Sequence, residues 1–113
     1  MRSPLSVLFA QLAVTRSILE ELLVYEDVPA EEALAEIHHC RAAIEACLVW
    51  KGANDRERSV RGAIDNTLRS CLDAMRMAEL GLTRNRRDMV ESSGRNLASA
   101  HERMLAISRV LEE

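Results

Sequence analysis

The sequence predicts an all-α protein, folded as an antiparallel up-down-up-down bundle of four helices. Aromatic residues make up 3% of the 113 residues and apolar residues 48%, so the core must be aliphatic, which favours helices over sheets. Only four glycines and two prolines are available for turns, so the elements must be long and few. Apolar residues also recur at spacings of three and four, the helical period. The length predicts a single domain over residues 1–113.

The first helix is expected from Pro4 to about Glu26. A proline at the first helical position costs no hydrogen bond, because an N–H group there would have no partner within the helix. The predicted core face is the row of residues that repeats every three or four positions, namely Leu5, Leu8, Leu12, Thr15, Leu19 and Leu22.

The second helix is expected over residues 29–51, with Asp27 as its cap or Pro29 as its first residue, and with Gly52 as its stop. The two glutamates that follow Ala30 suit the positive end of a helix dipole. The predicted core stripe comprises Ala33, Ile37, Cys40, Ile44 and Cys47, widened by Leu34 and Leu48.

The third helix is expected to begin after a cap at Asn54 or Asp55 and to stop at Gly81. One face of it carries the apolar residues Val60, Ile64, Leu68, Cys71, Leu72, Met75 and Ala78. Its connections to the neighbouring helices are very short, so successive helices must fold back on one another to bury their stripes.

The fourth helix is expected to begin after a cap at Thr83 or Asn85 and to reach the C-terminal region. Its predicted stripe is Val90, Leu97, Ala100, Met104, Ile107 and Leu111. The Ser-Ser-Gly run at residues 92–94 is its weak point and leaves open a kink or a division into two pieces.

The first helix is also apolar on its far side, and this predicts self-association. A helix that is apolar on two faces is normally buried on both. In a four-helix bundle the outer face can meet only water or another molecule, and two-fold dimers are the commonest assembly. We therefore expect a homodimer whose interface contains Val7, Val14, Ile18 and Tyr25. The alternative is that these are isolated surface aliphatics, which are normal.

The charge distribution argues against nucleic-acid binding and membrane insertion. Residues 1–50 carry three arginines and eight carboxylates, and residues 51–113 carry twelve basic and ten acidic groups, so no strongly basic stripe exists. The longest uncharged run, residues 3–15, is too short to span a bilayer. No small-x-small cleavage site follows it, so we do not expect a signal peptide.

The three cysteines fit a reducing compartment, and we expect a cytoplasmic protein. Cys40 and Cys47 are seven residues apart on one predicted helix, which places their Cα atoms about 10 Å apart. That separation exceeds disulfide reach. Reduced thiols packed as small apolar side chains are the expectation.

No metal or cofactor site is predicted. Glu36 and His39 form one Glu-x-x-His step of the kind that di-iron bundles use twice, but the position three before His101 is Ala98, so the second copy is missing. Glu36 and His39 also point away from the predicted core stripe. Glycine-rich phosphate loops, Cys-x-x-Cys pairs and nucleophile elbows are absent from the sequence.

Residues 38–42 read His-His-Cys-Arg-Ala and resemble the phosphoacceptor step of histidine-phosphotransfer domains. The resemblance implies that His38 is the acceptor and that Arg41 holds the phosphoryl oxygens. Arginine stands where that family usually has lysine, and Ala42 where it has glycine. The alternative is a boundary histidine that pairs with Glu45.

Residues 95–101 read Arg-Asn-Leu-Ala-Ser-Ala-His and resemble the Arg-polar-(x)n-His motif of HEPN domains, which are all-α ribonucleases and nucleotide-binding partners. The resemblance implies that Arg95 and His101 act together on a phosphodiester. On a regular helix these side chains lie about 120° apart, so they converge only if the helix breaks at Gly94. The alternative is an ordinary boundary histidine.

We therefore expect a non-catalytic, dimeric interaction or adaptor module. The competing interpretations are a HEPN-like protein that uses Arg95 and His101 and a phosphotransfer protein that uses His38 and Arg41.

Overall fold

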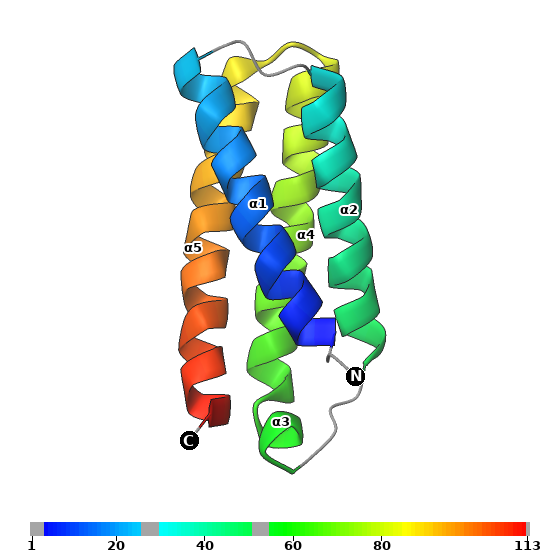
Figure 1. The fold of residues 1–113 in the computed structure, drawn as a ribbon, viewed down its shortest axis with the longest axis vertical. Coiled ribbons are helices and arrows are strands. Elements are labelled where there is room, and N and C mark those ends of the chain that lie inside the picture. The colour runs from blue at the N-terminus through cyan, green and yellow to red at the C-terminus, as the bar shows by residue number, and fades with distance from the viewer. Residues whose placement is uncertain (1–3, 26–29, 51–54, 113) are drawn as a thin grey trace.

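The computed structural model describes residues 4–25, 30–50 and 55–112. These residues form five helices and no strand: α1 (Pro4–Tyr25), α2 (Ala30–Val49), α3 (Asp55–Ser59), α4 (Arg61–Thr83) and α5 (Arg87–Glu112). The expected all-α class is confirmed. The molecule measures 44 × 23 × 19 Å, and Figure 1 shows four long helices along the longest axis with α3 at one end.

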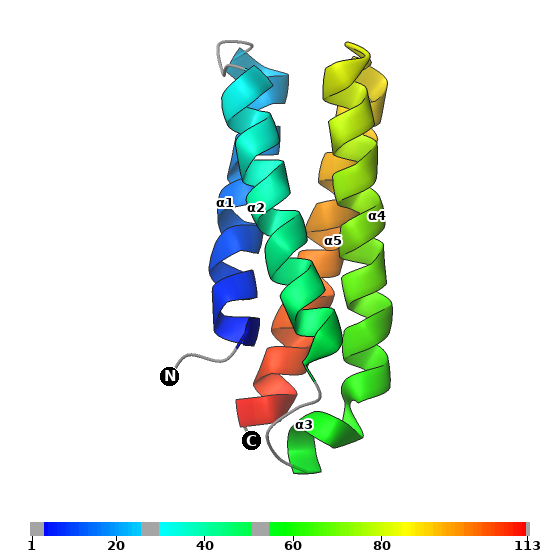
Figure 2. The same ribbon diagram turned by 90° about the vertical axis from the view of Figure 1, so that its right-hand side faces the viewer.

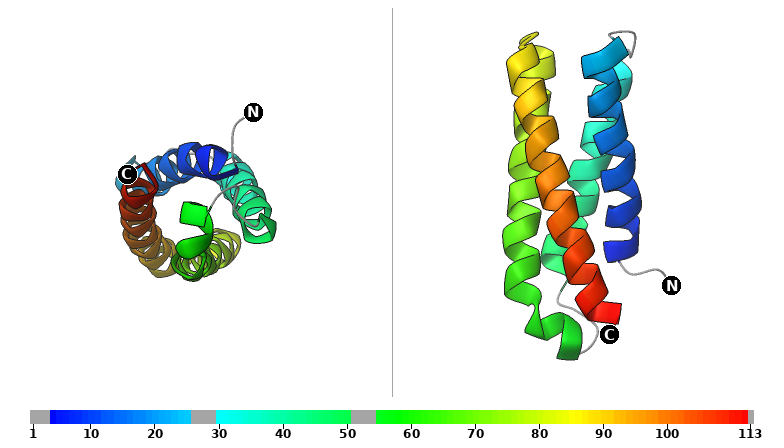
Figure 3. Two further views of the ribbon diagram at one scale, coloured as in Figure 1. Left: turned by 90° about the horizontal axis from the view of Figure 1, so that it is seen from below. Right: turned by 90° about the vertical axis from the view of Figure 1, so that its left-hand side faces the viewer.

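Each long helix packs against two others. α1 contacts α2 and α5, and α4 also contacts α2 and α5. The end-on view in Figure 3 shows these four helices arranged as a ring, and Figures 1 and 2 show the chain rising along α1 and α4 and returning along α2 and α5. The centre of the ring is where the apolar stripes meet.

The core is aliphatic and contains residues from all four long helices. Stripe residues of every predicted helix are fully buried, including Leu12, Ile44, Leu68 and Leu97. Leu22, Leu48, Ile107 and other longer side chains at the margins are half-buried and pack against the core. Among the described residues three polar side chains are buried, and all three are small; Thr67 and Ser93 donate hydrogen bonds to backbone carbonyls one turn earlier.

The expected third helix is two helices, which corrects the predicted start. Asp55 is the first residue of α3 rather than a cap, and Val60 separates α3 from α4 with φ −103° and ψ 10°. α3 reads Asp-Arg-Glu-Arg-Ser and has no buried residue. Because it has no apolar stripe to bury, packing does not hold it in line with α4. Asn54, like the caps and stops proposed at Asp27, Pro29 and Gly52, lies outside the described residues.

The turn between α4 and α5 also corrects a prediction. α4 continues past Gly81 to Thr83, and Asn85, expected as a cap of the next helix, instead ends this one with φ 54°. The Arg86 N–H donates to the Gly81 carbonyl at 2.7 Å, and the Asn85 N–H donates to the Leu82 carbonyl at 3.4 Å. This pair of bonds is the Schellman motif, in which asparagine tolerates the left-handed conformation.

α5 is continuous through residues 92–94, so the helix does not divide at Gly94. The Ser93 hydroxyl donates to the Val90 carbonyl at 2.7 Å and is buried. A Cβ at Gly94 would stand 3.9 Å from the Leu19 Cβ, so this part of α5 faces α1. Small residues here let the two helices approach without breaking either. In the described part of the chain no helix is long and apolar enough to cross a membrane.

Candidate interaction surface and polar clusters

The outer face of α1 is uncharged over most of its length. Val7 is 53% exposed and Val14 46% exposed, and Ile18 is half-buried. The side chain of Tyr25, the fourth predicted interface residue, lies outside the described residues. Between Ser6 and Ser17 every exposed position of α1 is serine, alanine or valine: Ser6, Val7, Ala10, Ala13, Val14 and Ser17.

The outer faces of α4 and α5 are different in kind. Their exposed positions carry many charges, several in ion pairs along one helix, such as Arg95 with Glu91 at 3.0 Å and Arg76 with Asp73 at 3.7 Å. Such pairs are typical of a helix surface that stays in water. The uncharged face of α1 therefore sets this helix apart from α4 and α5.

Gln11 shows which flank of α1 meets α2. Its side-chain amide donates to the Glu36 carboxylate at 2.8 Å and to the Thr15 hydroxyl at 3.2 Å. Val7 and Val14 lie four residues before and three residues after Gln11, and hence on the same flank of α1. The exposed valines are therefore turned toward the α2 side of the molecule.

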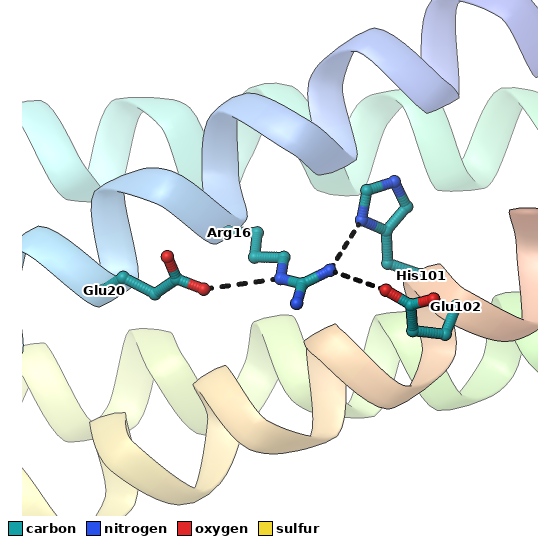
Figure 4. Close-up of polar contacts among 4 residues, drawn as sticks. All are labelled: Arg16, Glu20, His101 and Glu102. Atoms are coloured by element: carbon teal, nitrogen blue, oxygen red, sulfur yellow. Dashed lines mark hydrogen bonds and ion pairs between the residues drawn. The ribbon is translucent and has the colours of Figure 1, made fainter.

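Arg16 lies on the opposite flank of α1 and joins it to α5, as Figure 4 shows. Its Nη1 contacts the Glu102 carboxylate at 3.2 Å and the His101 Nδ1 at 3.4 Å, and its Nε contacts Glu20 at 3.4 Å. The Arg16–His101 hydrogen bond requires an unprotonated Nδ1, because the guanidinium can only donate. Partial burial, and next the Arg16 charge, lower the pKa of His101, while Glu102 opposes this shift.

This arrangement predicts that the protein loses stability as the pH falls. The folded-state pKa of His101 lies below the ordinary 6.5, so the unfolded chain binds the proton more readily. The contribution of neutral His101 to the stability of the folded protein is complete above about pH 6.5. It is lost as the pH falls from there toward the folded-state pKa. Urea unfolding between pH 7.5 and 5 should show a shallower pH dependence for His101→Gln than for the wild type.

The control for this prediction is His39→Gln, because His39 is 66% exposed and contacts only Glu36 among the described ion pairs. His39→Gln should keep the pH dependence of the wild type. If the stability of His101→Gln depends on pH as steeply as that of the wild type, the prediction is contradicted.

The structure places His38 and Arg41 around one carboxylate. The His38 Nε2 lies 3.7 Å from Glu79 of α4, and the Arg41 Nη1 lies 2.7 Å from the same carboxylate. Glu79, rather than the expected Glu45, is the acid beside His38. The His38 side chain is 59% exposed, but the cation that would hold a phosphoryl group already has an anionic partner.

Arg95 and His101 have separate partners. The Arg95 guanidinium contacts Glu91 at 3.0 Å and the Ser92 hydroxyl at 3.4 Å, while His101 contacts Arg16. The break at Gly94 that would let the two side chains converge is absent, because α5 is continuous there.

The three cysteines are free and buried in the core. Burial raises the pKa of Cys40 and Cys47 to about 11 and that of Cys71 to about 12. Because the thiolate is the reactive form, these thiols are poor nucleophiles in the folded protein. Across residues 4–25, 30–50 and 55–112, no group of three or more histidine, cysteine or acidic side chains is placed to hold a metal ion.

Sequence reasoning found the exposed valines but missed the polar partners that connect the helices. Glu79, Arg16 and the Gln11–Glu36 pair were not singled out. Arg16 carried one available signal, as the first charge after an uncharged run. Such a charge tends to lie where a buried face meets a solvated one.

No family model, curated protein or solved structure matches this chain.

Proposed function

We propose that this chain is an antiparallel four-helix bundle that acts as a non-catalytic interaction module and forms a homodimer through α1. The observation that supports the proposal is the uncharged outer face of α1, with Val7 53% and Val14 46% exposed. Removing aliphatic side chains from water favours association by about 25 cal/mol for each Å² buried. A dimer gives this face an apolar partner, and two-fold pairing is the commonest way to do so.

The polar clusters support a binding role better than a catalytic one. Arg41 of α2 forms an ion pair with Glu79 of α4, and Arg16 of α1 contacts His101 of α5. Each histidine motif is therefore part of a contact between helices. Such contacts fix the helices relative to one another and leave neither motif with a free cation for a phosphate. Free, buried cysteines fit a reducing compartment such as the cytoplasm, and the mixed charge of the surface does not favour nucleic acid.

Light scattering coupled to gel filtration tests the dimer. The wild type should run at twice the 12.7 kDa mass of one chain at micromolar concentration. Val14→Glu should weaken the dimer at least about tenfold, because it places a charge in the apolar contact. Its circular dichroism should stay helical, since the side chain is exposed in a single subunit.

The matched control is Val110→Glu on α5. Val110 is 47% exposed, almost the same as Val14, but it lies on a helix whose surface is charged. This variant should dimerise like the wild type. A wild type that stays at the mass of one chain at about 100 µM, well above the Kd of a typical specific dimer, would contradict the proposal.

A further inference from the structure

α2 adds a second row of exposed apolar residues to that of α1. Four of its exposed positions form one row at spacings of seven, four and three, and all four are apolar: Ala35, Ala42, Ala46 and Val49. Val49 is 75% exposed, the highest value among the large apolar residues that the structure describes. We call this row, together with Val7, Ala10 and Val14, the α1–α2 face.

The two rows lie on the same side of the bundle. Gln11 of α1 bonds to Glu36 of α2 at 2.8 Å, which fixes the flank on which the two helices meet. On α2, Ala35 and Ala46 lie about 90° around the helix from Glu36, away from the buried Ile37. Val7 and Val14 share the flank of Gln11, so the two apolar rows lie side by side, with His39 and the Gln11–Glu36 pair between them.

Most of the exposed carboxylates around the α1–α2 face gather at one end; further along α2, Glu45 is exposed and Glu36, 26% exposed, is bonded to Gln11. Glu21 near the end of α1 and Glu31 and Glu32 at the start of α2 are exposed, and Figure 1 shows these two helix ends at the same end of the bundle. At the opposite end the exposed face residues Val7 and Val49 are uncharged. Two copies stacked in the same orientation would bring the acidic ends together, and like charges at a contact oppose binding. A reversed copy sets each acidic end against the uncharged end of its partner.

The size of the face also favours a contact that includes both helices. A helix of 20 residues is about 30 Å long, and two neighbouring helices are together about 20 Å wide, which gives a footprint of about 600 Å². Stable dimers bury about 800 Å² of accessible surface on each partner. One helix alone would offer about half of this footprint, so a contact that includes both helices comes closer to the area of a stable dimer.

We infer that a second copy of this chain docks on the whole α1–α2 face, in head-to-tail orientation, with the two-fold axis near Ala10 and Ala13. The inference rests on the proposed dimer and adds its partner surface and orientation. Ala10 and Ala13 are exposed and lie near the middle of the uncharged stretch of α1. Their small side chains allow the two copies of α1 to approach closely.

The role of α2 is tested with Ala46→Glu, measured as a dimer dissociation constant by analytical ultracentrifugation. We expect the dissociation constant to rise at least about tenfold, a loss typical of a charge placed inside an apolar contact. Ala106→Glu is the matched control, because Ala106 is an exposed alanine on α5. It should leave the constant unchanged.

The outcomes separate this inference from the proposed function. If Ala46→Glu dimerises like the wild type while Val14→Glu does not, the dimer stands and the role of α2 is overturned. If the wild type is a monomer, the proposed function fails and the inference fails with it.

The orientation is tested by electron-spin distance measurement on Glu21→Cys carrying a nitroxide label. The natural cysteines are buried, so the label should attach to the introduced thiol. In the head-to-tail dimer the two labels lie on opposite sides of the two-fold axis, and the helix rise predicts a separation of about 30 Å. Labels closer than about 15 Å, the spacing expected for helices aligned in the same direction, would overturn the orientation.

Discussion

Replacing Gly81 with alanine should lower the free energy of unfolding by about 2 kcal/mol, within the range that overpacked cores lose. Gly81 is buried near the end of α4, next to the turn that joins α4 to α5. A Cβ there would stand 2.9 Å from the Val90 Cγ2, 3.0 Å from the Val90 nitrogen and 3.1 Å from the Arg86 carbonyl oxygen. Two of these atoms are backbone atoms, Arg86 in the turn and Val90 in α5, so the clash cannot be relieved by a side-chain rotation alone.

Gly62 provides the matched control within the same helix. A Cβ at Gly62 meets nothing within 4 Å, and the residue is exposed. Gly62→Ala should therefore raise the free energy of unfolding by about 0.5–1 kcal/mol, because alanine has the higher helix propensity and loses less backbone entropy on folding. Urea unfolding followed by circular dichroism measures both variants. Changes of the same sign in the two variants would contradict the close approach at Gly81.

The long helices could be predicted because their apolar stripes are local and repeated. The rows that contain Leu12, Ile44, Leu68 and Leu97 are buried as expected. The helix ends were harder to predict because they depend on single backbone conformations. Asn85 suits a cap at the start of a helix and also the left-handed turn at the end of one, and only the hydrogen bonds from the turn to Gly81 and Leu82 decide between them.

The polar contacts between helices could not be predicted from spacing within one helix. The contact of His38 with Glu79 depends on the register of α2 against α4, and that register is determined by the packing of the whole core. The exposed valines of α1 were predictable for the opposite reason. Their position opposite the buried leucines follows from the 100° step between residues and needs no partner helix.

Leu12→Ala should lower the free energy of unfolding by about 3 kcal/mol, the middle of the range for buried leucines. Leu12 is fully buried in the core, so the shorter side chain leaves a cavity that the surrounding helices can fill only in part. Urea unfolding of the wild type and the variant at the same low protein concentration, where the proposed dimer would be dissociated, isolates this effect from association.

Val14→Ala gives the comparison from the other face of the same helix. Val14 is 46% exposed in one subunit, so its truncation should change the unfolding of the monomer by less than about 0.5 kcal/mol. The destabilisation caused by Val14→Ala should instead grow with protein concentration, since burial of Val14 in the proposed dimer would add to the stability of the folded state. If Val14→Ala destabilises the dilute protein as strongly as Leu12→Ala, then Val14 belongs to the core of the single subunit. If the two variants differ as expected, the inner face of α1 holds the bundle together and its outer face is left for a partner.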